Sequence, residues 1–362
     1  MSQLSHHHHA QPHSLEDYGW DEAWDHAFSP YRTAGLLPAR IVRAERGSCE
    51  AATAAGILRA AVPGGAEHVP PTTGDWAVLS PATTSRGPVL HTILERRTSL
   101  VRSTASRTSQ AQVLAANVDT VVVAVSLAVP QKHGRTERML ALAWESGAQP
   151  VVVLTQADRC ADPQQAAAEV AEVAPGTDVL VTSAVTGEGL DTLTAVLNGT
   201  VVLLGPSGAG KSTLGNHLLG EERLATGAVR DADGKGRHTT AWRELAPLPG
   251  GGVLLDTPGL RAIGLHDART GLEQTFAEIE LLARECRFAD CAHGSEPGCA
   301  VLAAVAAGDI PQRRLESYHR LLRENAYAAS RTDARLRAGR EAAKKDITQH
   351  LRATYRFRDR QR

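Results

Sequence analysis

The pattern of apolar and polar positions changes character near residue 105. Before that point, short apolar segments are separated by glycine and proline, and they predict strands near 39–43, 55–58, 75–79 and 89–94. Short strands at this spacing are typical of a small barrel or sandwich of about five strands. Arginines follow the last of them at Arg96, Arg97 and Arg102, which favours a barrel of the oligonucleotide-binding (OB) type. A barrel that acts only as a spacer fits the same pattern.

Residues 105–268 instead alternate continuous apolar runs with segments of helical spacing. The predicted strands are 121–125, 150–154, 178–182 and 200–204, and the predicted helices are 135–146, 163–173 and 189–197. Strands that are apolar at every position are buried on both faces, so this pattern indicates an α/β domain with a mostly parallel sheet covered by helices. Because ligands of such sheets bind at the carboxyl ends of the strands, the polar residues that follow each strand are candidates for a site.

One of these strand ends carries a complete phosphate-loop motif. The apolar run 200–204 leads into the motif, and helical spacing continues from Thr213. Its members are Gly205, Pro206, Ser207, Gly208, Ala209, Gly210, Lys211 and Ser212. The glycines let backbone N–H groups point at phosphate oxygens, and the following helix adds its positive N-terminal end. We expect Lys211 to reach the β- and γ-phosphates of a nucleotide and Ser212 to bind Mg²⁺.

Two other strand ends are predicted to read the base. Thr155, Gln156, Ala157 and Asp158 occupy the place of the Asn-Lys-x-Asp element of GTPases, and Ser183 and Ala184 end the next strand. The Asp158 carboxylate can accept hydrogen bonds from the ring N–H and the exocyclic amine of guanine, a donor pair that adenine lacks. A backbone amide at the second element is expected to meet the guanine carbonyl oxygen. A turn aspartate looks the same in isolation, but the order and spacing of the two elements favour GTP.

The switch elements are predicted after the phosphate loop. A polar stretch contains His238, Thr239 and Thr240, where a threonine hydroxyl would complete the Mg²⁺ shell. His238 is a candidate for positioning the attacking water, and an ordinary loop histidine is the alternative. A strand then ends in D-T-P-G, where Asp256 would hold Mg²⁺ through water and the Gly259 amide would sense the γ-phosphate. Because the base-reading elements precede the phosphate loop, the sequence predicts a circularly permuted sheet.

A cluster of cysteines and histidine predicts a metal site further along. Cys286, Cys291, His293 and Cys299 have the spacing C-x4-C-x-H-x5-C, which suits tetrahedral Zn²⁺ in a structural role. Scattered core cysteines are the alternative. Five cysteines are too few and too uneven for a disulfide scaffold, so we expect a reducing, cytoplasmic location. No apolar run approaches the ~20 residues of a membrane span, and no secretory signal pattern opens the chain.

Charge distinguishes the C-terminal part. Residues 310–362 contain 15 Lys and Arg against 6 Asp and Glu, a net charge of +9, whereas the remainder carries −10. A basic arm indicates a polyanion such as RNA, although a solvated surface helix would have the same charge. Helices are predicted at 271–284 and 311–328, with Tyr318 and Tyr327 as core residues; stacking residues are the alternative. The predicted domains are 1–34 (a disordered extension without a role), 35–104 (OB-type barrel), 105–268 (permuted nucleotide-binding domain) and 269–362 (zinc-binding helical domain with a basic tail).

As a set, these motifs resemble one family, the circularly permuted bacterial GTPases that depend on the small ribosomal subunit (RsgA/YjeQ type). The resemblance covers roughly residues 35–345 and is carried by 74–76, 115–119, the phosphate loop, 236–240, 256–259 and 286–293. It implies an OB-type barrel, a permuted GTPase domain and a zinc domain, with GTP/GDP, Mg²⁺ and Zn²⁺ as cofactors. It also implies GTP hydrolysis stimulated by the 30S subunit late in its assembly, with 16S rRNA as a contact. We expect a monomer that does not contact a membrane.

Two positions depart from that family's pattern. Gln156 stands where the family usually has Lys, whose stem covers the guanine face, so lower guanine affinity is expected. Thr155 replaces the commoner Asn and is expected to lose a brace on the phosphate loop. Leu260 follows Gly259 where Ras-like enzymes carry a water-orienting Gln, and the family shares this apolar residue, so we expect slow intrinsic turnover. The alternative functions are an rRNA adaptor that binds nucleotide but barely hydrolyses it, and a phosphate-loop ATPase or kinase that acts on a small molecule.

Overall fold

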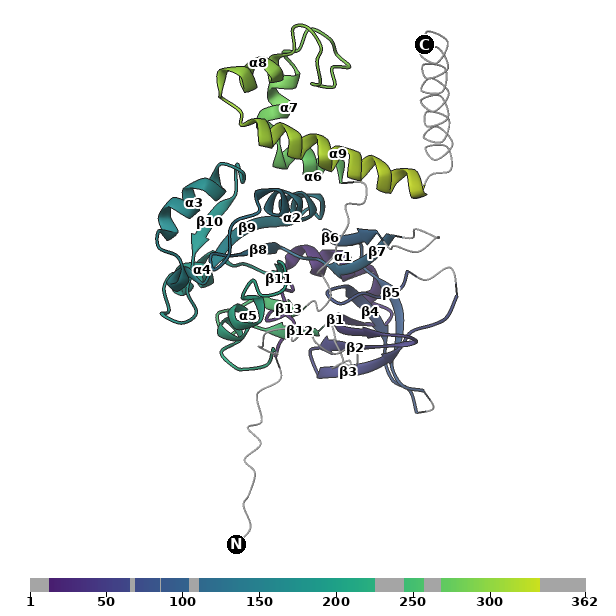
Figure 1. The fold of residues 1–362 in the computed structure, drawn as a ribbon. Coiled ribbons are helices and arrows are strands. Elements are labelled where there is room, and N and C mark those ends of the chain that lie inside the picture. Colours follow the sequence, from purple (N-terminus) through teal and green to yellow (C-terminus); the bar gives the residue numbers. More distant parts are fainter. Residues whose placement is uncertain are drawn as a thin grey trace, which may run out of the picture. The chain divides into compact units, whose positions relative to one another are not determined.

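The computed structural model describes residues 13–65, 69–84, 86–103, 111–224, 244–256 and 268–332 (Figure 1). The chain divides into two compact units. The first consists of Met1–Leu100 and Val113–Ala262, and the second of Val101–Gln112 and Ile263–Arg362. Each unit has its own architecture, which follows from the periodicity of its apolar residues.

The first unit contains a closed barrel of five strands. These are β1 (Leu37–Glu45), β2 (Ser48–Thr53), β3 (Gly56–Ala61), β4 (Trp76–Ser80) and β5 (Val89–Ile93), in the order β1-β2-β3-β5-β4. Alternate residues form its core, among them Ala39 and Ile41 of β1 and Ala77 and Leu79 of β4. Small and branched side chains suit so narrow an interior, and the predicted five-stranded barrel is confirmed. A separate two-stranded sheet pairs β6 (Ser99–Ser103) with β7 (Ala111–Ala116).

The expected disorder of the segment before the barrel is wrong for part of its length. The sequence pattern predicts disorder over residues 1–34, whereas helix α1 (Glu22–Arg32) lies within this range. Trp24 and Phe28, four residues apart on one face of α1, are only 4% and 2% exposed. The Trp24 ring lies 5.9 Å from the ring of Trp76 in β4. Burial of this short aromatic stripe stabilises the helix, and its polar surroundings hide the stripe in the sequence.

The first unit also contains a six-stranded sheet in the order β10-β9-β8-β11-β13-β12. Its strands are β8 (Thr120–Ser126), β9 (Gln149–Thr155), β10 (Asp178–Val181), β11 (Thr200–Leu204), β12 (Glu244–Pro247) and β13 (Val253–Asp256). All neighbours are parallel except the edge strand β12, which is antiparallel to β13. Val202 of β11 pairs with Val121 of β8. The strands that lead into the base-reading elements and the strand that leads into the phosphate loop therefore belong to one sheet, which confirms the permuted arrangement.

Helices cover both faces of this sheet (Figure 1). They are α2 (His133–Glu145), α3 (Pro163–Ala171), α4 (Leu190–Val196) and α5 (Lys211–Leu219). A short 3-10 helix, η1 (Ala157–Arg159), follows the end of β9. Leu193 of α4 and Leu214 of α5 share an apolar cluster with Val201 and Leu254 of the sheet. Helix α2 contacts β8 and β9, and α3 contacts β10. The fully apolar strands are thus shielded from water, as the sequence pattern predicts.

A buried arginine joins the barrel to the sheet. Arg40 of β1 is 2% exposed, and its Nη2 donates to Thr200 Oγ1 at 2.8 Å and to the Asn117 carbonyl oxygen at 3.2 Å. Its guanidinium carbon lies 4.6 Å from the centre of the Trp76 ring. Burial lowers the pKa of Arg40 to about 10, so the side chain is still a cation at neutral pH. Because Thr200 begins the strand that ends in the phosphate loop, the barrel is tied directly to that strand.

In the second unit, the described residues 268–332 form helices and their connections. Its helices are α6 (Arg269–Thr275), α7 (Ala277–Ala283), α8 (Ala300–Ala307) and α9 (Gln312–Thr332). The single helix predicted over 271–284 is two helices, because Phe276 has a non-helical backbone (φ −115°, ψ 39°) and packs its buried ring against Tyr318. Tyr318 is a core residue, as expected, whereas Tyr327 is 49% exposed. None of the described helices is both long and apolar enough to cross a membrane.

Candidate functional site

The phosphate loop connects β11 to α5 at the carboxyl end of the sheet. Its glycines have positive φ angles, 157° at Gly205, 79° at Gly208 and 75° at Gly210. A Cβ at Gly205 would lie 2.7 Å from the backbone oxygen of Ala124, so a larger residue would push the loop away from β8. Helix α5 begins at Lys211 with no side-chain cap and no acidic residue in its first turn. The N-terminal end of α5 therefore favours an anion.

The Lys211 side chain folds back over the phosphate loop toward the residues that begin it. Its Nζ donates to the carbonyl oxygens of Gly205 and Pro206, at 2.8 and 2.7 Å. Ser212 is half-buried and Thr213 is exposed in the first turn of α5. The Lys211 ammonium group and the N-terminal end of α5 suit the phosphates of a nucleotide. The hydroxyl oxygens of Ser212 and Thr213 suit a hard cation such as Mg²⁺.

Thr155 connects the base-reading segment to the phosphate loop. It ends β9, is 4% exposed, and its Oγ1 donates to the Ala209 carbonyl oxygen at 2.9 Å. It also lies close to Gly210, where a Cβ would come within 3.2 Å of the same Oγ1. The expectation that threonine loses the brace on the loop is therefore wrong, because its hydroxyl makes the hydrogen bond. The brace joins two segments that are far apart in the chain.

A pocket of about 230 Å³ lies where these segments meet, and Asp158, Ala184 and Thr213 line it. The Asp158 carboxylate is exposed and accepts a hydrogen bond from Ser183 Oγ at 2.6 Å. Ser183 is fully buried, and its Oγ also accepts the backbone N–H of Val185 at 3.2 Å. These bonds fix the orientation of the carboxylate. Within the described residues, no hydrogen-bond acceptor takes the Ala184 N–H.

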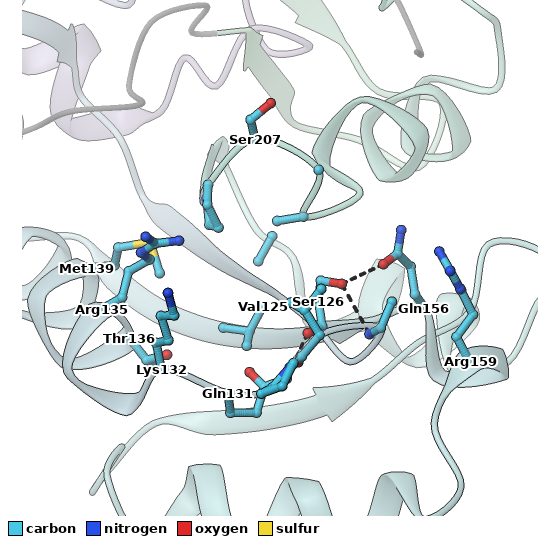
Figure 2. Close-up of a pocket in the computed structure, with 17 residues that line it drawn as sticks. Val125, Ser126, Gln131, Lys132, Arg135, Thr136, Met139, Gln156, Arg159 and Ser207 are labelled. Carbon is cyan, nitrogen blue, oxygen red and sulfur yellow. Dashed lines mark hydrogen bonds between the residues drawn. The ribbon is translucent and has the colours of Figure 1, made fainter. Parts of the chain in front are cut away.

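Gln156 lines both this pocket and a larger cavity of about 540 Å³, shown in Figure 2. Its backbone is left-handed (φ 61°, ψ 41°), and its Oε1 accepts a hydrogen bond from Ser126 Oγ at 2.5 Å. Gln131 Nε2 in turn donates to the Ser126 carbonyl oxygen at 2.7 Å. The larger cavity lies between the β8–α2 connection and the phosphate loop, and Lys132 and Arg135 line it.

The structure thus brings the base-reading and phosphate-loop segments to one pocket, since Asp158 and Gly210 both line it. Sequence reasoning missed Arg159 and Val185, which line this pocket, and Ser126, which lines the larger cavity. The available signal was their position, because each ends a strand or directly follows a predicted base-reading element. Neither periodicity nor a motif indicates where their side chains lie.

Other predicted elements lie outside the described residues. These are His238, Thr239 and Thr240 of the first switch, Gly259 of the second, the histidine tract at 6–9 and the basic tail beyond 332. Asp256 ends β13, the strand next to β11, and only its backbone is described. The strand that carries Asp256 therefore ends at the same edge of the sheet as the strand that carries the phosphate loop.

Four side chains in the second unit form a cluster whose donor atoms suit a metal ion. The ligand atoms of Cys286, Cys291, His293 and Cys299 all lie within 4.8 Å of one another. His293 Nδ1 is 3.4 Å from Cys299 Sγ and 3.6 Å from Cys286 Sγ, separations that suit the edges of a tetrahedron around Zn²⁺. Burial lowers the pKa of His293, which favours the neutral imidazole that a metal requires. Cys299 also precedes α8, where its Sγ accepts the Leu302 N–H at 3.4 Å.

Known proteins resemble this chain over most of its length. The sequence profile described as RsgA GTPase matches residues 93–266. A Streptomyces coelicolor protein named small ribosomal subunit biogenesis GTPase RsgA is 58% identical over 337 residues, which cover 91% of this chain and 92% of that protein. An Opitutus terrae protein of the same name is 42% identical over an alignment of 365 positions, gaps included, which covers 96% of this chain and 99% of that protein.

Two solved structures share the fold. The crystal structure of YjeQ from Thermotoga maritima superposes with a TM-score of 0.61 at 24% identity, over 80% of this chain and 98% of that one. The structure of YloQ, described as a circularly permuted GTPase, superposes with a TM-score of 0.57 at 24% identity, over 80% of this chain and 94% of that one. At such identities the similarity bears on the fold alone.

Proposed function

The chain belongs to the RsgA family of GTPases, and from that premise we propose that it binds the small ribosomal subunit and hydrolyses GTP during late 30S assembly. One observation carries the proposal: Asp158 and the phosphate loop line a single pocket, although the base-reading element precedes the loop in the sequence. The relatives from Streptomyces coelicolor and Opitutus terrae, both named for small-subunit biogenesis, support the choice of partner.

The smaller pocket is assigned to guanine. There the Asp158 carboxylate accepts hydrogen bonds from the base, and the Ala184 N–H donates to the base carbonyl oxygen. Ser183 keeps the carboxylate in position through its 2.6 Å hydrogen bond. The nucleotide-binding set is Thr155, Gln156, Ala157, Asp158, Ser183, Ala184, Gly205, Pro206, Ser207, Gly208, Ala209, Gly210, Lys211, Ser212, Thr213, Asp256 and Gly259.

The phosphates are assigned to the loop and to the N-terminus of α5, whose uncapped amides and Lys211 supply positive charge. Mg²⁺ would be held by Ser212, by Thr239 or Thr240, and through water by Asp256. When bound, Mg²⁺ neutralises negative charge that develops on the phosphate oxygens. His238 is proposed to orient the attacking water, and Lys211 to stabilise charge on the transferred phosphoryl group.

The cysteine and histidine cluster is assigned to structural Zn²⁺. Three thiols and an imidazole complete a tetrahedron, so no position is left for a substrate. We further propose that the OB-type barrel and the basic C-terminal arm contact 16S rRNA, since the arm carries the positive charge that phosphates require. The protein is proposed to act in the cytoplasm as a monomer.

Single-turnover GTP hydrolysis with and without purified 30S subunits tests the proposal. We expect the subunit to raise the rate about tenfold or more, in the manner of an activator that orders a GTPase site. Lys211→Ala should abolish hydrolysis under both conditions. Equal rates with and without 30S subunits would rule out activation and would favour the second candidate, an rRNA adaptor with little hydrolysis. Leu260 in place of a water-orienting Gln is the observation behind that alternative.

A base-specific test separates GTP from other nucleotides. Asp158→Asn should weaken GTP binding and improve binding of xanthosine triphosphate, because an asparagine amide donates to the additional carbonyl oxygen of xanthine. ATP binding should not change. If Asp158→Asn binds GTP as tightly as the parent protein does, the carboxylate does not read guanine, and the ATPase or kinase alternative gains support.

A further inference from the structure

The base pocket contains a cation that the binding set above leaves unused. Arg159 directly follows Asp158 and lines both the base pocket and the larger cavity. Its side chain is exposed, and within the part of the chain that the structure describes no ion pair or side-chain hydrogen bond holds its guanidinium. Figure 2 shows Arg159 and Gln156 projecting in the same direction from this segment. The guanidinium is thus available to a ligand in the pocket.

Gln156 is already engaged. Its Oε1 accepts the Ser126 hydroxyl at 2.5 Å, and this bond ties the side chain to the end of β8 (Figure 2). A glutamine at this position also lacks the charge and the longer stem of a lysine. The face of the base that a lysine stem covers in the family's pattern therefore needs another side chain, and Arg159 is the cation that lines the pocket.

The carboxylate of Asp158 does not neutralise this arginine. Asp158 accepts its hydrogen bond from Ser183, and no ion pair joins it to Arg159 among the described residues. A planar, weakly hydrated guanidinium stacks well on an aromatic ring, and its attraction to the ring face grows as water is excluded. A purine in the pocket would present such a ring.

Val185 belongs to the second base-reading element. It directly follows Ala184, lines the same pocket and is 82% exposed. Among the described residues the Val185 side chain is left largely uncovered, although its backbone N–H is held by Ser183 Oγ. A flat base in the pocket would remove part of this apolar surface from water.

We propose that Arg159 and Val185 supply the two faces of the guanine site. The guanidinium of Arg159 covers one face of the base and replaces the lysine stem that Gln156 does not provide, and the Val185 side chain contacts the opposite face. This inference rests on the proposed function, since it deepens the description of the same site. Arg159 acts in binding and specificity, and it takes no part in the hydrolytic step.

Titration calorimetry of nucleotide-free protein with GDP and with the slowly hydrolysed GTP analogue GMPPNP tests the inference. Arg159→Ala should weaken both nucleotides by the same factor, about 3- to 30-fold, because they share the base. Gln156→Lys introduced into the Arg159→Ala protein should restore the affinity to within about threefold of the parent. Val185→Ala should weaken both nucleotides by about two- to threefold, since it removes apolar contact area.

Arg135→Ala is the matched control. It removes the same charge from the larger cavity without changing the lining of the base pocket, so GDP affinity should stay within about twofold of the parent. The inference is overturned if Arg159→Ala binds as tightly as Arg135→Ala, if Gln156→Lys restores nothing, or if GMPPNP loses more affinity than GDP, since the last result would place the cation on the phosphates. If the parent protein itself binds no guanine nucleotide, the proposed function fails, and the two failures are distinguished by this first titration.

Discussion

Replacing Thr155 by valine should loosen the phosphate loop without opening a cavity. The two side chains have nearly the same shape, so the change removes only the hydroxyl that donates to the Ala209 carbonyl oxygen at 2.9 Å. Both residues are buried, with Thr155 4% and Ala209 1% exposed. A buried acceptor that loses its donor costs about 1–3 kcal/mol. For a unit of this size, a loss near the middle of that range lowers Tm by about 4–8 °C.

The same change should also weaken nucleotide binding. Without the brace, part of the binding free energy is used to order the loop, and a share of about 1 kcal/mol corresponds to roughly a fivefold weaker GDP affinity. Calorimetric titration with GDP measures this loss, and thermal unfolding of the nucleotide-free protein measures the loss of stability. The two readouts are independent, because one concerns the loop and the other the whole unit.

Thr120→Val is the control for this prediction. Thr120 is also buried, its Oγ1 donates to the Asn198 carbonyl oxygen at 3.1 Å, and it begins β8 at the opposite end of the sheet from the phosphate loop. Its replacement should lower Tm by a similar amount and leave GDP affinity unchanged. If Thr155→Val and Thr120→Val bind GDP equally well, the Thr155 hydroxyl does not position the loop, and the reasoning fails.

Three further predictions concern other parts of the chain. Ser183→Ala should weaken GDP binding by about 10- to 100-fold, since a charged hydrogen bond to the base-reading carboxylate is worth about 1.5–3 kcal/mol; calorimetry measures it, and an unchanged affinity contradicts it. Removal of zinc by a chelator should release one equivalent of metal and make three additional thiols reactive, whereas Cys291→Ser protein should purify with little zinc; metal and thiol titrations check both. Burial raises the pKa of Cys49 to about 11, so at pH 8 a maleimide should label the half-exposed Cys160 first and Cys49 only after unfolding, as peptide mass spectrometry would show.

Local patterns predicted the elements that depend on neighbours in sequence. The strand–loop–helix arrangement around Gly205 follows from an apolar run, three glycines with positive φ angles and a helical continuation. The same is true of the barrel strands, whose alternate residues face one core. Where a short pattern was weak, prediction failed. Helix α1 depends on Trp24, which packs on Trp76, and on Phe28, which packs on Trp20. The break at Phe276 depends on its contact with Tyr318.

The candidate site shows the same division. Its motifs could be read from residue types, because a phosphate loop and a base-reading aspartate need particular groups at particular spacings. The contacts that individual side chains make within the site could not be predicted from the sequence. The Thr155 hydroxyl replaces an amide as the brace, the Gln156 side chain is tied to Ser126, and Arg159 lines the base pocket. Each of these depends on how strand ends lie beside one another.

The sequence by itself determined the kinds of element, their order and the chemical groups at each strand end, because those properties depend on local periodicity and residue type. The tertiary structure alone decided that β8 and β11 are neighbours, that Arg40 of the barrel reaches Thr200, and that the Gln156 side chain is held by Ser126. The physical reason is that long-range packing selects among many pairings of similar apolar strands, and no short segment of the chain specifies that choice.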